Sequence, residues 1–159
     1  VVFFVGKNRR MGIENIYIAR VTDGLVLVAS MEHSSGGERM ELFKNQAKQL
    51  LKKLNPRSVA KMSIESSPFI FHYVIEDGVC YLTLTDRSYP KRLSFLFLED
   101  ISREFVASLK NDFGDDWQHE LVRACDSISP NSFFLIFFIV HYSIRKQLGG
   151  HMPSLNLTK

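Results

Sequence analysis

Hydrophobic positions near the start of the chain predict a β-hairpin. Residues 15–22 and 25–31 are rich in β-branched residues and leucine, which favour strands. Asp23-Gly24 stands between them, and this dipeptide supplies the positive φ values that a tight hairpin turn requires. Because both stretches are nearly all apolar, we expect both strands to be covered on both faces.

A change of hydrophobic period after this hairpin predicts a helix over residues 38–55. Lys44, Lys48 and Lys52 recur every fourth residue on one side, and Asn55-Pro56 is a stop signal. The basic side is either an ordinary solvated helix face or a contact for anionic lipid or an acidic partner. The apolar side consists of Met40, Phe43, Ala47, Leu50, Leu51 and Leu54.

Three strands are predicted to follow this helix. Residues 61–65 alternate in polarity, with Met62 and Ile64 expected to point inward, which predicts a half-buried strand at a sheet edge. Residues 69–76 and 79–86 form a second hairpin around the turn dipeptide between them. Counting back from Asp77-Gly78 pairs Glu76 with Val79, Ile75 with Cys80 and His72 with Thr83.

A second helix is predicted over residues 90–113. Tyr89-Pro90 opens it, because proline is tolerated in a first turn, and Gly114 is a good C-terminal cap. Residues 115–129 are polar and ambiguous. The apolar stripe of this helix consists of Leu93, Phe97, Ile101, Phe105 and Leu109, and Leu96 and Leu98 widen it.

The order of these elements predicts an α+β domain. Five strands joined mainly by hairpins imply an antiparallel sheet, and the two amphipathic helices must cover its faces. A length of 159 residues fits one compact core. The net charge of +3 comes without a cluster of Lys and Arg interleaved with aromatic residues, so we expect no nucleic-acid partner.

Candidate chemistry is sparse along the chain. The five histidines show no metal-ligand spacing, no Cys-x-x-Cys motif occurs, and no Gly-rich stretch has phosphate-loop spacing. Cys80 and His72 are the one candidate pair of a thiol nucleophile and its general base. The predicted register, however, separates them by several residue pairs along the hairpin. We therefore expect no catalytic residues, no metal, no cofactor and no small-molecule substrate, and we interpret the chain as a binding module.

The predicted edge strand over residues 61–65 offers one route to a partner. An exposed edge can accept an extended peptide by β-augmentation. The opposite interpretation is that Lys61 and Glu65 keep this edge from pairing, since charged edge residues discourage association.

The two ends of the chain depart from this regular pattern. Residues 1–10 are expected to be an N-terminal extension. Phe133 to Val140 is an unbroken apolar run, but a spanning helix needs roughly 20 residues, so the run is not a convincing membrane anchor. It is expected either to be buried or to make peripheral contact with a membrane.

Four segments in order carry a resemblance to the longin domain, and more closely to the N-terminal domain of R-SNAREs that work between the endoplasmic reticulum and the Golgi. The resemblance runs from about Ile16 to Glu120, and because the regular pattern begins after Met11 we expect the domain to span residues 11–120. It implies the longin, profilin-like fold, with a five-stranded antiparallel sheet and helices on both faces. The segments are IARVTDGLVLVASM, FKNQAKQLLKKLN, FHYVIEDGVCYLTLTDRSYPKRLSFLFLEDISREF and NDFGDDWQHE.

The resemblance also implies a function. Longin domains of this kind are not enzymes; they lie on the cytosolic face of endoplasmic reticulum and Golgi membranes, fold back on SNARE-motif segments and help vesicle coat subunits to sort the SNARE. The other interpretations are a longin-like subunit of a coat adaptor or tether, and a thiol-dependent hydrolase. The implied groove lies between the first helix and the third strand and consists of Phe43, Ala47, Leu50, Met62 and Ile64, which could instead be core residues.

The resemblance weakens after about Glu120. The family continues there with a Lys-rich third helix, a heptad SNARE motif and a membrane anchor. Residues 121–159 read instead as a divergent, partly apolar tail without a SNARE motif. Alternative splicing, retained non-coding sequence or an inaccurate gene model would each produce such a tail.

Overall fold

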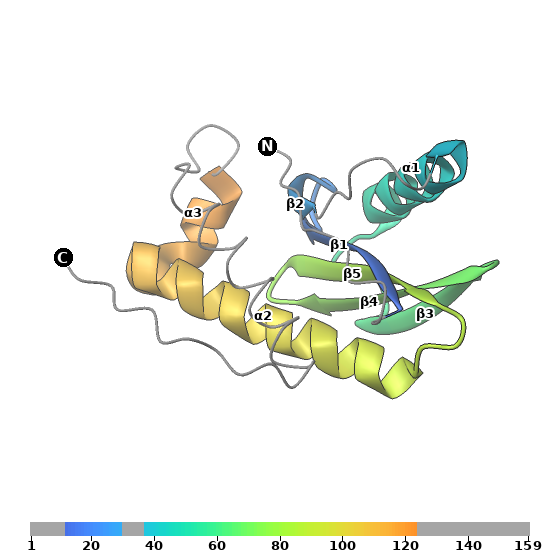
Figure 1. The fold of residues 1–159 in the computed structure, drawn as a ribbon. Helices are drawn as coiled ribbons and strands as arrows, with labels where there is room; N and C mark the ends of the chain where they lie inside the picture. The colour runs from blue at the N-terminus through green and yellow to red at the C-terminus, as the bar shows by residue number, and fades with distance from the viewer. Residues whose placement is uncertain (1–11, 30–36, 124–159) are drawn as a thin grey trace.

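The computed structural model describes residues 12–29 and 37–123 (Figure 1). The described strands form one antiparallel sheet in the order β2-β1-β5-β4-β3. In chain order the elements are β1 (Ile13–Arg20), β2 (Val26–Ala29), α1 (Gly37–Lys53), β3 (Lys61–Ser66), β4 (Phe69–Glu76), β5 (Val79–Asp86), α2 (Lys91–Phe113), the short 3-10 helix η1 (Gly114–Asp116) and α3 (Trp117–Arg123).

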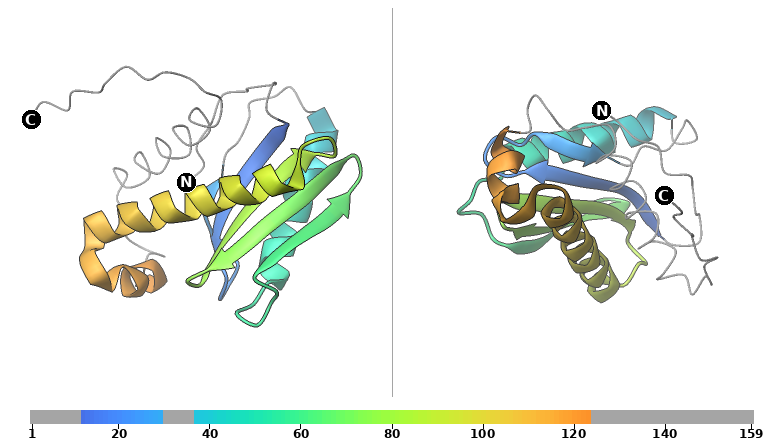
Figure 2. Two further views of the ribbon diagram at one scale, coloured as in Figure 1. Left: turned by 90° about the horizontal axis from the view of Figure 1, so that it is seen from below. Right: turned by 90° about the vertical axis from the view of Figure 1, so that its left-hand side faces the viewer.

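The sheet lies between two layers of helix. Figure 2 shows α1 on one face of the sheet, with α2 and α3 on the other. The central strand β5 is buried along almost its whole length, as a strand covered on both faces must be. The predicted α+β fold with helices on both faces is therefore confirmed.

The β4–β5 hairpin has the predicted register. Glu76 pairs with Val79, Ile75 with Cys80 and His72 with Thr83. The turn residues Asp77 and Gly78 have φ angles of +49° and +77°, the left-handed conformation that this two-residue turn requires. Because side chains alternate along a strand, this register decides which side chains face α1 and which face α2.

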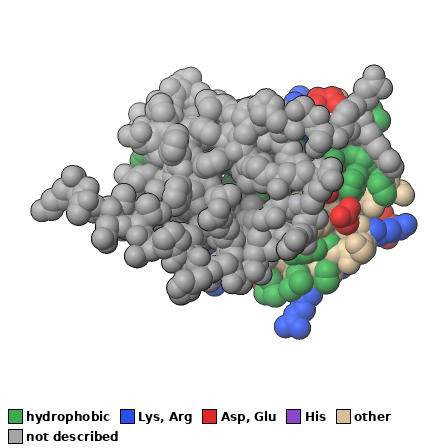
Figure 3. Space-filling model, viewed as in Figure 1, with side chains coloured by type: hydrophobic (Ala, Val, Ile, Leu, Met, Phe, Trp, Pro, Cys, Tyr) green, Lys and Arg blue, Asp and Glu red, His purple; other side chains and the backbone are tan. Residues whose placement is uncertain are grey.

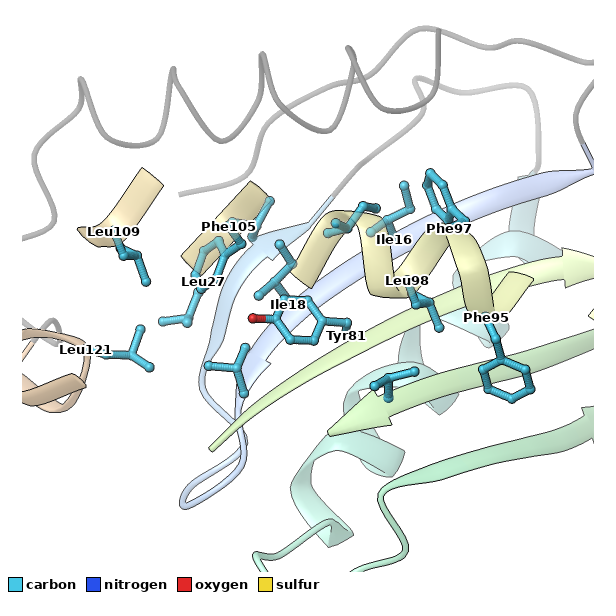
Figure 4. Packing of buried hydrophobic residues seen from close by; sticks show 14 of the residues in the cluster. Ile16, Ile18, Leu27, Tyr81, Phe95, Phe97, Leu98, Phe105, Leu109 and Leu121 are labelled. Atoms are coloured by element: carbon cyan, nitrogen blue, oxygen red, sulfur yellow. The ribbon is translucent and has the colours of Figure 1, made fainter. Parts of the chain in front are cut away.

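The face covered by α2 contains the larger of the two hydrophobic clusters (Figure 4). Phe97, Ile101 and Phe105 of the predicted stripe are fully or almost fully buried there. The prediction was wrong for two flanking leucines, because Leu93 and Leu96 are 44% and 41% exposed. Leu98, also predicted for this side, is fully buried, and Phe95, which was not predicted, is buried as well. Phe95 packs edge-to-face against His72 at a centroid distance of 5.5 Å.

Helix α3 closes one end of this cluster. Its side chains Trp117 and Leu121 are 4% and 6% exposed. The Nη1 atom of Arg20, on β1, donates hydrogen bonds to the carbonyl oxygens of Leu121 and Val122 at 2.9 and 2.8 Å. These carbonyls belong to the last described turn of α3. A strand arginine therefore ties β1 to the backbone of a helix that the polar sequence left ambiguous.

The face covered by α1 contains the second cluster. Phe43, Ala47 and Leu51 of α1 are buried against side chains of β1, β4 and β5, including Cys80 and Leu82. The apolar side predicted for this helix is therefore confirmed.

None of the helices in the described ranges is long and apolar enough to cross a membrane. The expectations for residues 1–10 and for the run from Phe133 to Val140 lie outside the described residues.

Candidate partner-binding surface

The structure places the five predicted groove residues at two depths. Phe43 is 6% exposed and Ala47 is fully buried, so both are core residues of the α1 face. Leu50 and Ile64 are half-buried, and Met62 is 38% exposed. Met62 was expected to point inward. It stands on the α1 side of the sheet, but β3 is an edge strand and no strand of the described residues lies beyond it. Leu50, Met62 and Ile64 are called the α1–β3 surface below.

Strand β4 forms the floor beside this surface. Tyr73, paired with Met62, is 2% exposed, and Phe71, paired with Ile64, is 3% exposed. The Tyr73 hydroxyl donates to the Met62 sulfur at 3.8 Å, and burial raises the pKa of Tyr73, so the hydroxyl keeps its proton. A polarisable thioether is therefore held at the rim of an aromatic floor, a chemistry suited to apolar side chains of a partner.

Two further contacts fix the distance between α1 and the β3–β4 hairpin. Phe43 packs edge-to-face on Phe69, with ring centroids 4.9 Å apart. The Ser66 hydroxyl donates a hydrogen bond to Gln46 Oε1 at 2.8 Å. Sequence reasoning missed both contacts, because neither follows from spacing along a single element.

Most of this domain matches a known protein family. Residues 27–131, more than half of the chain, match the model described as Longin: Regulated-SNARE-like domain. The chain belongs to the longin family. Its sheet of five antiparallel strands with helices on both faces agrees with the fold that the longin resemblance implied.

Curated relatives place this longin domain among Sec22 proteins. It is 49% identical over 89 residues to vesicle-trafficking protein SEC22b of Xenopus tropicalis, and 47% identical over 90 residues to the 25.3 kDa vesicle transport protein SEC22-1 of Arabidopsis thaliana. Each match covers 55% of this chain and 41% of the relative. It is 31% identical over 134 residues to protein transport protein SEC22 of Kluyveromyces lactis, which covers 84% of this chain and 59% of the relative.

The matched part of the chain therefore spans between two-fifths and three-fifths of these relatives. The Sec22-type longin resemblance is confirmed. Among solved structures, a roadblock/LC7 domain from Streptomyces avermitilis covers 87% of this chain and 88% of its own at 11% identity, with a TM-score of 0.33, a similarity too low to bear on the fold.

The longin sheet does not bring Cys80 and His72 together. Cys80 belongs to the α1-facing cluster, whereas His72 packs on Phe95 of α2 and bonds through its Nδ1 and Nε2 atoms to Ser63 and Thr85 at 2.8 and 3.1 Å. Burial raises the pKa of Cys80 to about 12. Burial, and then the charge of Lys91, lower the pKa of His72 to about 4. A protonated thiol and a histidine on the opposite face cannot act as a nucleophile and its base.

The described part of the longin domain contains no cluster of three His, Cys, Asp or Glu side chains that could hold a metal ion. The basic side of α1 is only partly neutralised: Lys44 lies 3.5 Å from Glu41, while Lys48 and Lys52 are exposed.

A second apolar area lies on the opposite side of the domain. In Figure 3, hydrophobic side chains reach the surface at the lower right. Leu93 and Leu96, near the N-terminal end of α2, are exposed leucines. Leu96 matches Met62 in size and exposure but faces the other way, so it provides a control position for the α1–β3 surface.

Proposed function

We propose that this longin domain acts in vesicle transport between the endoplasmic reticulum and the Golgi by binding other polypeptides. The α1–β3 surface is the proposed binding site for a SNARE-motif segment. We also propose that vesicle coat subunits bind this domain. The supporting observation is the apolar, partly exposed set Leu50, Met62 and Ile64 over a buried aromatic floor, in a chain whose relatives are named vesicle-trafficking proteins.

This function requires no chemistry from the domain. The separation of Cys80 from His72 removes the thiol-hydrolase interpretation of that pair. We assign the domain a regulatory role. A SNARE motif bound to its surface cannot enter a fusion complex. The domain and the bound SNARE motif together would form the surface that vesicle coat subunits recognise. The proposed location is the cytosolic face of endoplasmic reticulum and Golgi membranes.

The proposed domain covers residues 11–120, preceded by an extension over residues 1–10 and followed by the tail of residues 121–159. The core contribution of Leu121 and the family match to residue 131 support a domain whose last helix runs somewhat past Glu120.

A binding measurement with an R-SNARE heptad peptide tests the proposal. Met62→Asp places a charge on an exposed site of the α1–β3 surface, where a docked apolar side chain would bury it. We expect the dissociation constant, measured by fluorescence anisotropy of the labelled peptide, to rise about tenfold or more, as for a central apolar contact.

Leu96→Asp is the matched control, because Leu96 is equally exposed on the α2 side. It should leave peptide affinity unchanged, and thermal unfolding should show both variants folded. Equal affinities for the wild type and Met62→Asp, or equal losses in the two variants, would refute the assignment of this surface. Ala47 is unsuitable for the test, since an aspartate at a fully buried site would destabilise the domain itself.

A further inference from the structure

Strand β3 forms one edge of the sheet (Figure 1). Within the described residues it pairs only with β4, from Lys61 opposite Val74 to Ser66 opposite Phe69. Its outer side therefore presents a row of backbone donors and acceptors that another strand could pair with.

One backbone hydrogen bond decides which groups point outward. The Ile75 amide donates to the Ala60 carbonyl at 2.7 Å, just before β3 begins. In an antiparallel ladder the residues that bond to the neighbouring strand alternate. The N–H and C=O groups of Met62 and Ile64 therefore point toward β4, and those of Lys61, Ser63 and Glu65 point away from the sheet.

The charged side chains of this edge stand on the α2 side and remain exposed. Lys61 Nζ lies 2.5 Å from Glu99 of α2 and 4.6 Å from the ring centroid of Phe95. Glu65 lies 2.5 Å from Arg87, in the connection after β5. The side chains of Lys61 and Glu65 are 48% and 69% exposed, so a further charge can approach either one.

We propose that this edge binds a second copy of the same chain. Two β3 strands would pair antiparallel about a twofold axis through Ser63. Lys61 of each copy would then lie opposite Glu65 of the other, and Met62 would lie opposite Ile64 on the α1 side. The charges would form a row of alternating sign across the interface, consisting of Arg87, Glu65, Lys61 of the second copy and Glu99 of the second copy.

The geometry selects this register. A shift by one residue would set Lys61, Ser63 and Glu65 against residues whose backbone groups already bond to β4, so the ladder could not form. A shift by two keeps the backbone pairing but moves Lys61 and Glu65 out of alignment with each other. Only pairing centred on Ser63 satisfies the backbone and sets opposite charges face to face.

Charged residues usually keep sheet edges apart because like charges meet when identical edges approach. Here the four-residue separation of one cation and one anion makes the edge complementary to itself. This self-association goes beyond the proposed transport function. It pairs the backbone edge of β3 through Lys61, Ser63 and Glu65, and Met62 and Ile64 of the α1–β3 surface would flank the interface on the α1 side.

A charge-reversal cycle tests the interface. The wild-type chain should show a concentration-dependent mass by sedimentation velocity at low salt. Glu65→Lys alone creates two Lys–Lys contacts, and Lys61→Glu alone creates two Glu–Glu contacts, so each should weaken the dimer about tenfold or more. The double variant, Lys61→Glu with Glu65→Lys, restores opposite charges between the two copies but sets like charges beside Glu99 and Arg87 within each copy. It should therefore bind more tightly than either single variant and more weakly than the wild type.

Mixing the two single variants gives the sharpest result. Each is weak alone, but together they again set Lys against Glu at both contacts, so a fluorescently labelled Glu65→Lys chain should bind Lys61→Glu about tenfold or more tightly than either variant binds itself. Lys48→Glu carries the same charge change on α1 and should dimerise like the wild type. A monomeric wild type at every soluble concentration, single variants that associate normally, or a mixture without heterodimer would each overturn the proposal. Thermal unfolding shows that every variant compared is folded.

Discussion

Replacing Gly24 by alanine tests how closely the β1–β2 hairpin holds the end of α1. Gly24 has a φ angle of +69°, and a Cβ atom built there would lie 2.9 Å from the Cα atom of Lys52 and 3.0 Å from the Leu51 carbonyl oxygen. Both are backbone atoms of the last helical turn, so no side-chain rotation can make room. The hairpin and the helix must move apart.

The expected loss follows from two contributions. A left-handed alanine costs about 1–2 kcal/mol relative to glycine, partly offset by about 0.4–1 kcal/mol from the stiffer unfolded chain. Displacing packed backbone adds about 1–3 kcal/mol. Gly78 isolates the first contribution, because its φ angle is +77° and nothing lies within 4 Å of its Cβ position. We expect Gly78→Ala to lose about 1 kcal/mol of unfolding free energy and Gly24→Ala about 2–4 kcal/mol.

Urea unfolding of the two variants and the wild type measures these losses, with the slope of the unfolding free energy against urea confirming that the same surface is exposed. Equal losses in Gly24→Ala and Gly78→Ala would refute the reasoning, since only the contact with α1 distinguishes them.

Two further predictions concern buried titratable groups. The pKa of His72 is lowered from 6.5 to about 4 in the folded domain. As the pH falls below 6.5, the histidine therefore takes up a proton in the unfolded chain before it does so in the folded domain. The free energy of unfolding should be unaffected by this histidine above pH 6.5 and should fall by up to about 3 kcal/mol as the pH drops toward 4. The unfolding free energy of His72→Gln should therefore depend less steeply on pH than that of the wild type, and parallel curves would contradict this. Cys80, with a pKa of about 12, should resist iodoacetamide at pH 8 in a Cys125→Ser background until the domain unfolds; rapid alkylation of the folded domain would show an accessible thiolate.

Much of the fold was predictable because local rules govern it. The two Asp-Gly dipeptides locate both hairpins, and Asp77-Gly78 alone sets the register of β4 and β5, since a two-residue turn leaves one pairing. Helical spacing of apolar residues located α1 and α2, and Gly114 ends α2 with its N–H bonded to the Lys110 carbonyl.

The candidate surface was less predictable, because exposure depends on which elements meet. Spacing alone could not separate Ala47, which is fully buried where α1 approaches the sheet, from Leu50 on the same helix, which is half-buried. Met62 alternates like an inward residue, yet it is exposed because no strand lies beyond β3 among the described residues.

The sequence by itself determined the order of the elements from β1 to α2, the location of both hairpins, the register of the β4–β5 hairpin and the longin resemblance, because each depends on neighbouring residues or on a local pattern. The tight first turn was predicted wrongly: β1 ends at Arg20, β2 begins at Val26, and Gly24 has a positive φ angle whereas Asp23 does not. Only the tertiary structure decided that Phe95 is buried while Leu93 and Leu96 are exposed, that Arg20 bonds to the backbone of α3, and that Lys61 lies against Glu99. These contacts join residues far apart in the chain, so their geometry exists only after the helices have packed on the sheet.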